Sequence, residues 1–408
     1  MFASNPFLPT FSQSDPGSET GCRAPVPQGM SGEGRNLPQG ANLLNVAGEK
    51  TESNDTLGYP YVLEFYRMTE FETALLPVDE SSISLAARLL REGQVVAFPT
   101  ETVYGLGADG LNEQAVKRIF AAKNRPADNP LILHIAAIED AYPLCQWTSQ
   151  AQELAQAFWP GPLTMLLSRK SLVPGITTAG LPTVALRMPA HPAALALIKA
   201  AGIPIAAPSA NLSGRPSPTS AMHVYEDMLG RVPLILDGGE CQVGVESTVL
   251  DMSGDVPTIY RPGAVTGEQI AMVAGECKVA PSVMRPLSEN ESAPSPGMRH
   301  RHYAPKARMT LVKGATAQVA AYINQQVDQG ENACILAFEE HLPLYGARDA
   351  ESLGRTAQDA AQRLFYLLRD MDTRGISRIY AETLPETGLG LAVMNRMARA
   401  AAFDIITV

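Results

Sequence analysis

The strongest constraint on the fold is an alternation of short apolar runs with helix-like segments between residues 76 and 279. Short apolar runs bounded by glycine, proline or polar residues are typical of strands, whereas apolar residues spaced by three and four positions indicate helices. Because alternating strands and helices form layered domains, the pattern predicts an α/β domain with a twisted, mixed, open sheet. The predicted strands are 95–98, 131–135, 163–167, 184–188, 203–207, 234–236, 248–251 and 258–260, with helices at, for example, 113–123 and 150–157.

A second alternation follows in residues 310–408 and predicts a smaller, parallel α/β (Rossmann-like) domain. Its predicted strands are 309–312, 333–338 and 378–382, and its predicted helices end near 327 or lie near 357–371 and 391–401.

Two segments lack this periodicity. Residues 1–67 are rich in Pro, Gly, Ser, Asn and Gln, so they are predicted to be disordered. Met68 then opens a stretch like an ordinary protein start, which favours a dispensable tail or a start codon placed too far upstream, with a docking tail as the alternative. Residues 281–309 are proline-rich and basic, as in a linker, which leaves domains at 68–280 and 310–408.

Composition excludes several classes of protein. Apolar residues make up 45% of the 408 residues and charged residues 18%, which is typical of a soluble globular protein. No apolar run approaches the ~18 residues of a membrane span, and the N-terminus lacks the pattern of a secretory signal. The net charge of −10 does not indicate a nucleic-acid binder, although it says nothing of a local basic groove.

The cysteines indicate a reducing compartment. They are odd in number, widely scattered and without metal-binding spacing, so we expect a cytoplasmic protein. They are Cys22, Cys145, Cys241, Cys277 and Cys334.

One glycine motif is misleading. Gly105, Gly107 and Gly110 satisfy GxGxxG, and Asp128 lies roughly where a ribose-binding acid would stand. In a dinucleotide-binding fold, however, the motif follows its strand immediately, whereas here Pro-Thr-Glu-Thr-Val-Tyr intervenes. We therefore disfavour that fold, and because no Walker A sequence is present, any ATP must be held without a P-loop.

The segment just before these glycines carries more polar groups than a turn needs. Thr100, Glu101, Thr102 and Tyr104 crowd into a predicted turn with two glycines, whereas a structural turn needs glycine and one Asn or Asp. The excess predicts a ligand site beyond the carboxyl end of a strand.

A cationic loop follows the next helix, for which Asn112 is the predicted N-cap. Lys123 ends the helix, and Arg125 lies in a segment stiffened by two prolines. The cations either cap the helix dipole or form a rigid loop for a polyphosphate.

Two strand residues and one polar loop are the remaining candidates for a ligand-binding role. A strand histidine such as His134 is usually structural, whereas a half-buried arginine such as Arg187 requires an anion. Residues 207–219 offer hydroxyls, an amide and backbone N–H groups, which suit a phosphate or nucleotide.

Together these residues resemble the threonylcarbamoyl-AMP synthases, the YrdC/Sua5 family. The motifs occur in the family's order and read PTETVYGLG, KNRPADNP, FWPGPLT, LPTVALRMP, SANLSGRPSPT, VESTVLD and YRPG. The segments SPGMRHRHYAPKA and ETGLGLAVMNRMARAA resemble the linker and C-terminal domain of the longer, Sua5-type members. The resemblance covers about residues 76–408 and implies a YrdC-like catalytic domain followed by a Sua5-type α/β domain.

The resemblance implies a nucleotidyltransferase that forms threonylcarbamoyl-AMP and pyrophosphate from L-threonine, bicarbonate and ATP. The family's product serves the N6-threonylcarbamoyladenosine (t6A) modification of tRNA and passes to a separate tRNA threonylcarbamoyl transferase. Mg²⁺ is implied with ATP, although no carboxylate is an evident ligand for a metal. Weak direct tRNA binding is a further implication, and no membrane partner is implied.

The resemblance also implies roles for individual residues. The residues implied to hold threonine are Thr102, His134, Arg187, Ala207 and Ser247. The residues implied to hold ATP are Arg125, Asn129, Thr183, Ser209, Ser217 and Arg261. Lys123, Arg125 and Tyr303 are the implied catalytic residues, and His302 with Tyr303 resembles a gate over the site.

Two other functions remain open at this point. The chain could be a double-stranded-RNA or tRNA-binding module, or a carbamoyl-transfer or regulatory homologue that kept the fold and lost the activity. A measurement of pyrophosphate release distinguishes an active synthase from both of these alternatives.

Overall fold

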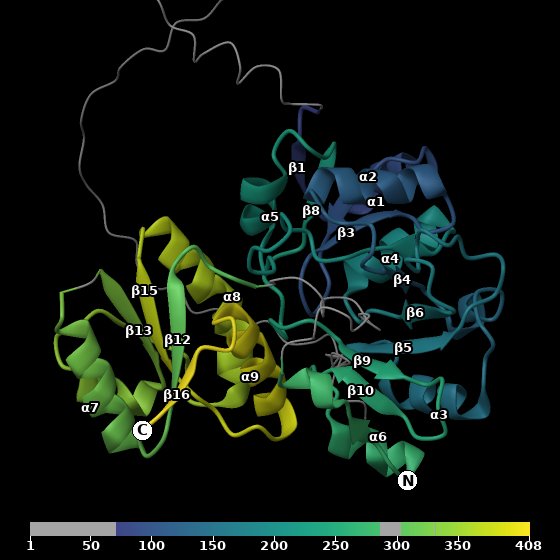
Figure 1. Ribbon diagram of the computed structural model, residues 1–408. Helices are drawn as coiled ribbons and strands as arrows, with labels where there is room; N and C mark the ends of the chain where they lie inside the picture. Colours follow the sequence, from purple (N-terminus) through teal and green to yellow (C-terminus); the bar gives the residue numbers. More distant parts are fainter. Residues whose placement is uncertain (1–70, 286–302, 331) are drawn as a thin grey trace, which may run out of the picture. The chain divides into compact units, whose positions relative to one another are not determined.

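The computed structural model describes residues 71–285, 303–330 and 332–408 (Figure 1). The predicted tail, His302 and most of the predicted linker lie outside the described residues. In those three ranges, no helix is long and apolar enough to cross a membrane.

The larger domain is built on an eleven-stranded mixed sheet, which confirms the predicted sheet type. Neighbouring strands pair both ways: β4 and β6 are parallel, whereas β5 and β6 are antiparallel. In sheet order the strands are β1 (Ala74–Pro77), β8 (Leu234–Asp237), β2 (Val96–Phe98), β3 (Gly105–Asp109), β7 (Ile205–Ala206), β4 (Ile132–His134), β6 (Thr183–Arg187), β5 (Leu163–Ser168), β9 (Thr248–Asp251), β10 (Thr258–Arg261) and β11 (Lys278–Val279).

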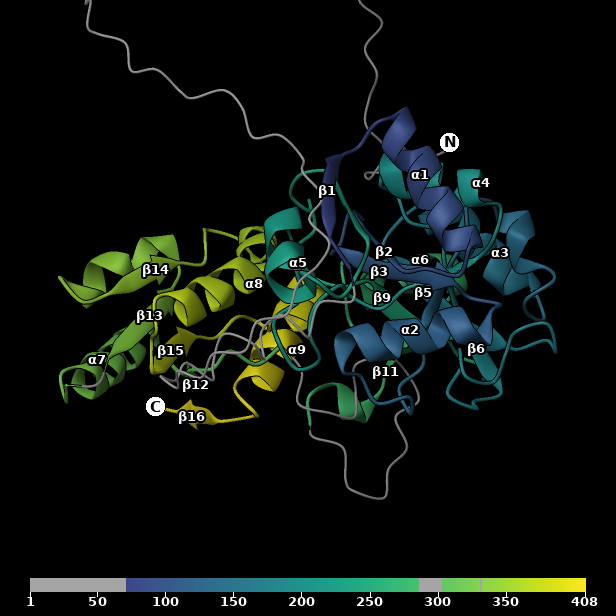
Figure 2. The same cartoon turned by 90° about the horizontal axis from the view of Figure 1, so that it is seen from above.

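Helices cover both faces of this sheet because its strands are apolar on both sides. Along β2, Ala97 packs into the core under α2 and α3, whereas Val96 and Phe98 pack with α1 and α4 on the other face (Figure 2). Asn112 caps α2 as predicted, because its side chain accepts hydrogen bonds from two backbone N–H groups. The helices are α1 (Glu80–Arg91), α2 (Glu113–Lys123), α3 (Ser149–Phe158), α4 (Pro192–Ala201), α5 (Ala221–Met228) and α6 (Gly267–Ala274), with 3₁₀ helices η2 (Ile138–Ala141) and η3 (Pro281–Val283).

The glycines of the GxGxxG motif serve strand packing. Gly105 and Gly107 lie inside β3 and not in the turn that the sequence predicts. A Cβ at Gly107 would stand 2.7 Å from Ile205 and 2.8 Å from Phe98, and one at Gly110 would stand 2.2 Å from Leu133. The motif therefore lets three strands approach closely, as glycine permits, and forms no phosphate loop.

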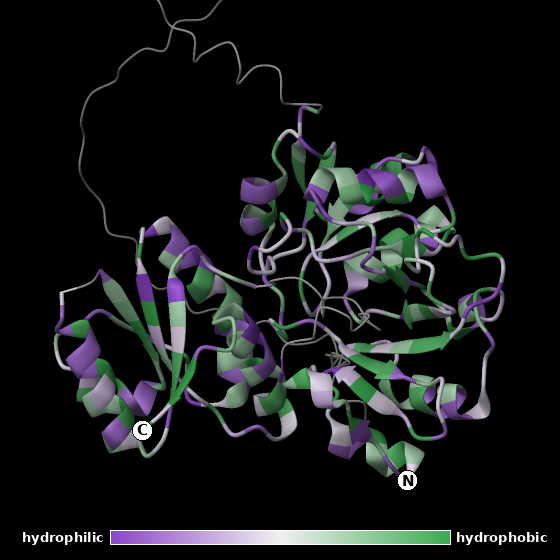
Figure 3. Cartoon of the chain, in the orientation of Figure 1, coloured by the Kyte–Doolittle hydropathy of each residue, from purple (hydrophilic) through white to green (hydrophobic). Residues whose placement is uncertain are grey.

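The sheet of the smaller domain is parallel, as predicted, and among the described residues it has two strands, β14 and β16, beyond the three that were predicted. Leu311 and Leu336 pack under α8 and α9, whereas the alternate residues Val312 and Ile335 face α7. In Figure 3 these strands are green over part of their length, with purple ends on β12 and β15, and the neighbouring helices carry both colours. Its strands in sheet order are β14 (Ala350–Ser352), β13 (Ala333–Ala337), β15 (Arg378–Glu382), β12 (Arg308–Lys313) and β16 (Ile405–Thr407), and its helices are α7 (Thr316–Val327), η4 (Glu339–Tyr345), α8 (Ala357–Thr373) and α9 (Gly388–Ala400).

The two domains share a buried interface. Val243 and Val245 of the larger domain belong to one apolar cluster with α8 and α9. Gly244 between them has a φ of +80°, and a Cβ there would stand 2.3 Å from the carbonyl oxygen of Ala361 in α8. This close approach explains the glycine.

Buried ion pairs also cross this interface. Arg369 of α8 donates to Asp227 of α5 at 2.7 Å, and both side chains are almost fully buried. Arg215 also pairs with Asp227. Charges held this far from water depend on their partners, because an unpaired buried charge is costly.

We expect Arg369→Met to lower the free energy of unfolding by about 3 kcal/mol, measured by urea denaturation. Removing one partner of a buried pair costs ~3–5 kcal/mol, and Arg215 keeps this loss at the lower end. The control is Arg374→Met, because Arg374 pairs with exposed Asp349 and Glu351 and should contribute at most about 1 kcal/mol. Equal losses in the two variants would contradict the burial argument.

Candidate active site

A cleft lies where loops of the larger domain meet Tyr303. His134 and Arg187 line it from the ends of the parallel strands β4 and β6, where they are paired in register. The structure brings together ten of the predicted residues: Thr102, Arg125, His134, Arg187, Ala207, Ser209, Ser217, Ser247, Arg261 and Tyr303.

Three guanidinium groups line the cleft, and each keeps a donor without a partner among the described residues. Arg187 donates through Nη2 to Glu101 at 2.7 Å and through Nε to the Gly161 carbonyl, which leaves Nη1. Arg261 donates through Nε and Nη2 to Ser247, which also leaves Nη1. Arg125 has a buried Nε with no partner. Buried donors of this kind indicate an anionic ligand.

Hydroxyl groups also line the cleft, and for Thr100 and Thr102 the proton positions can be assigned. Thr100 Oγ1 donates to the Val103 carbonyl at 2.6 Å. Its single proton is then used, so in the 2.9 Å contact between the two hydroxyls Thr102 is the donor. Thr102 therefore presents only acceptor lone pairs to a ligand. Ser247 Oγ is 2.8 Å from Thr164 Oγ1 and also accepts from Arg261.

Lys123 lies beside the cleft and does not line it. The side chain is buried, and its Nζ donates to the carbonyls of Ser209 and Asn211. Burial, with the charge of Arg125 added, holds the pKa of Lys123 well below its ordinary value. In this structure the lysine thus fastens the loop that carries Ser209.

Asn129 and Thr183 are not among the residues that line the cleft. Asn129 is buried, and its carbonyl accepts from Arg125 at 3.3 Å. Thr183 begins β6, where it pairs with Ser168, whereas Arg187 ends the same strand. Four residues of strand separate them by ~13 Å. The predicted ATP-binding roles of Asn129 and Thr183 stay predictions.

Two carboxylates received no individual role from the sequence, although Glu101 is among the polar residues of the turn that predicts a ligand site. Glu101 is the partner of Arg187, and Glu246 lines the cleft and accepts from Ser217. Each stands beside a predicted residue inside a motif, in TET and VES. Their position next to a predicted site residue is the sequence feature that could have indicated a role for each carboxylate.

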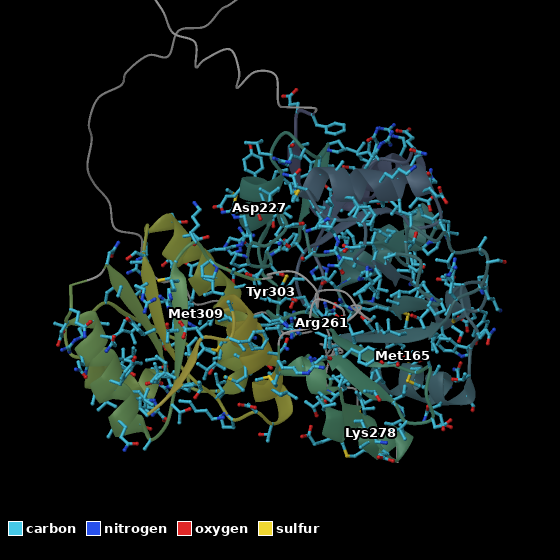
Figure 4. The ribbon with its side chains drawn as sticks, in the orientation of Figure 1. Met165, Asp227, Arg261, Lys278, Tyr303 and Met309 are labelled. Atoms are coloured by element: carbon cyan, nitrogen blue, oxygen red, sulfur yellow. The ribbon has the colours of Figure 1, made fainter. Side chains whose placement is uncertain are left out.

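Tyr303 closes the cleft on the side of the smaller domain, and Figure 4 shows it beside Arg261. The side chain is buried, and its ring stacks on Phe365 of α8 at 5.4 Å between centroids. Its φ of +64° is unusual for a bulky residue. Burial raises the pKa of Tyr303, so the phenol is protonated at neutral pH.

His134 is neutral in the folded protein. Burial, and secondly the charge of Arg187, lowers the pKa of His134 to about 3. Its Nδ1 lies 3.2 Å from the Ile132 carbonyl. Because a carbonyl only accepts, this contact is a hydrogen bond in the tautomer with the proton on Nδ1, which leaves Nε2 as an acceptor.

Comparison with known proteins agrees with this geometry. Residues 88–263 match the Sua5/YciO/YrdC family model, described as telomere recombination, and residues 265–402 match the threonylcarbamoyl-AMP synthase C-terminal domain. A threonylcarbamoyl-AMP synthase of Pyrococcus abyssi is 48% identical over 81% of this chain and 97% of its own length. One of Bacillus subtilis is 47% identical over 81% and 96%.

The chain belongs to the Sua5/YciO/YrdC family. The predictions of this family and of a nucleotidyltransferase-type enzyme are thereby confirmed. The crystal structure of Pyrococcus abyssi Sua5 complexed with L-threonine is similar with a TM-score of 0.77 and 46% identity, covering 83% of this chain and all of that one. The likeness extends through both domains of this family member.

The depressed pKa of His134 predicts a pH dependence of stability. The unfolded chain binds a proton near pH 6.5 and the folded one only near pH 3, so stability falls as pH drops through this window. We expect His134→Gln to remove about 1.4 kcal/mol of that loss per pH unit between pH 6 and 4. Urea denaturation of both proteins across this range measures the difference. Parallel pH profiles would show that His134 does not stay neutral.

Proposed function

We propose that the protein is an L-threonylcarbamoyladenylate synthase that condenses L-threonine, bicarbonate and ATP and releases pyrophosphate. The observation that carries this proposal is that three arginines with unpartnered donors line one small cleft. The relatives named threonylcarbamoyl-AMP synthase and the threonine-bound relative support it. The reaction joins two anionic substrates, so it requires positioning and charge neutralisation.

Threonine would bind at the Arg187 end of the cleft. The free Nη1 of Arg187 suits the substrate carboxylate. The acceptor lone pairs of Thr102 and of neutral His134 suit the N–H and O–H groups of threonine. Ser247 and the backbone of Ala207 complete this end. The amine nitrogen attacks the carbon of bicarbonate, and loss of water gives the carbamate.

ATP would bind at the end formed by Arg125, Arg261, Ser209 and Ser217. A carbamate oxygen attacks the α-phosphorus, and the bond from that phosphorus to the bridging oxygen of the β-phosphate breaks. Pyrophosphate leaves with the electron pair. The guanidinium groups stabilise the charge that develops on the phosphoryl oxygens.

Mg²⁺ would enter with ATP. Within the described ranges, no cluster of three or more His, Cys, Asp or Glu side chains is placed to hold a metal ion. Among the residues that the structure describes, Glu246 is the only carboxylate that lines the cleft, and it is engaged by Ser217 and Arg396. These residues do not form a dedicated Mg²⁺ site, and we derive no step through the metal.

The product is a mixed anhydride of a carbamate and a phosphate, and it must be used quickly. We propose that a cytoplasmic tRNA threonylcarbamoyl transferase consumes it in t6A formation. Direct tRNA binding by this chain stays a prediction.

Substrate choice tests the proposed pocket, with pyrophosphate release and the mass of the acyl-adenylate measured for each amino acid. Serine lacks one methyl group, worth ~0.8 kcal/mol, and should be used about four- to tenfold less efficiently than threonine. Valine keeps the size but leaves buried polar groups unpaired, at ~1–3 kcal/mol, and should be used less. Valine turnover equal to that of threonine would show that the pocket is wrongly assigned, and a lack of pyrophosphate with any amino acid would refute the function.

The variant Arg125→Ala tests whether the cationic loop binds phosphate or only caps the helix dipole. We expect kcat/KM for ATP to fall at least about tenfold, which corresponds to ~1.4 kcal/mol. Burial lowers the pKa of Arg125 to about 10, and its Nε is unpaired, so removing the charge should not lower the melting temperature. Lys117→Ala, which removes an exposed cation from the preceding helix α2, is the control and should change neither value. Early melting with normal turnover would make the loop structural.

A further inference from the structure

Arg396 of α9 connects the smaller domain to Glu246, a residue that lines the cleft. The arginine side chain is fully buried, and its Nε donates to Oε2 of Glu246 at 2.8 Å. Its Nη2 donates to the backbone carbonyl of Glu246 at 3.3 Å. The remaining Nη1 donates to Asn395 at 2.8 Å, so each nitrogen of the guanidinium has an acceptor.

Glu246 connects that arginine to the proposed nucleotide site. It lines the cleft, and its second oxygen, Oε1, accepts the hydrogen bond of Ser217. Burial alone would raise the pKa of Glu246, yet Arg396, Arg261 and the Ser217 hydroxyl together hold it below its ordinary value. The carboxylate is therefore negatively charged inside a cleft that must also receive a triphosphate.

A carboxylate beside phosphate groups weakens their binding, because like charges repel strongly where water is excluded. Arg396 opposes that effect, because it places a positive charge against the carboxylate from the side away from Ser217. We propose that Arg396 is a positioning residue for ATP: it neutralises Glu246 and holds it as the acceptor for Ser217. The inference rests on the proposed function and makes the smaller domain part of the nucleotide site.

If Arg396 only stabilised the fold, its loss would have the same effect as the loss of a neighbouring buried arginine, Arg399. Arg399 lies one turn further along α9, is also buried, and donates to the carbonyl of Ser282, which does not line the cleft. Loss of either arginine weakens the same domain interface. Of the two, only Arg396 pairs directly with the carboxylate that lines the cleft, so only its loss removes the ion-pair partner of Glu246.

The experiment compares four proteins by steady-state pyrophosphate release against ATP and against threonine, beside thermal melts. In Arg396→Met we expect the KM for ATP to rise at least tenfold, whereas the KM for threonine stays within threefold of the wild-type value. The double variant Arg396→Met/Glu246→Gln should return the KM for ATP to within threefold, because the uncompensated charge is gone. Arg399→Met should lower the melting temperature without raising the KM for ATP.

Three results would overturn the inference: an unchanged KM for ATP in Arg396→Met, an equal rise in Arg399→Met, or no recovery in the double variant. If Arg396→Met does not fold, Arg396→Gln replaces it, because it also removes the charge but keeps a donor for Glu246. The wild-type protein keeps the two proposals apart. Without pyrophosphate release from wild type the proposed function fails, whereas an active wild type with insensitive variants refutes the role of Arg396 alone.

Discussion

Cationic side chains buried close together repel one another, and this repulsion limits how the cleft can be built. The structure meets the constraint with buried carboxylates. Glu101 pairs with Arg187, Glu246 with Arg396, and Asp227 with Arg369. In the first pair the arginine lines the cleft, whereas in the second the carboxylate lines it and the arginine lies behind. Each pair holds a buried cation in place before a ligand supplies negative charge.

The same pairs fix the loops that form the cleft. Glu101 belongs to the turn after β2, and its pairing with Arg187 ties that turn to the end of β6. Ser217 and Glu246 join the loop after β7 to the loop before β9. Lys123 holds the loop after β7 in place by donating hydrogen bonds to the carbonyls of Ser209 and Asn211. Hydrogen bonds and ion pairs therefore hold these loops in place, because loops carry few apolar side chains that could pack into a core.

Local patterns in the sequence were sufficient for much of the fold. Strands β9 and β15 and helix α2 have the predicted ends, because each is a periodic apolar run bounded by turn or cap residues. The strand β3 was missed, since its glycines imitate a turn. Their real function is visible only when Phe98 and Ile205 are seen packed over Gly107. A short-range pattern cannot show that a glycine is required by a neighbour 98 positions away in the chain.

The site residues also divide into those that local sequence patterns indicate and those that only the structure shows. Those inside motifs, such as Arg187 and Ser217, could be selected from the sequence, and the structure brings them to one cleft. Arg396 could not, because an arginine on an amphipathic helix ordinarily lies on the solvated face. Its partner Glu246 is 150 residues away in the chain, and only the packing of α9 against the larger domain removes both from water. A buried charge requires a partner from whichever element is nearest in space, so the electrostatics of the cleft depend on the whole two-domain arrangement.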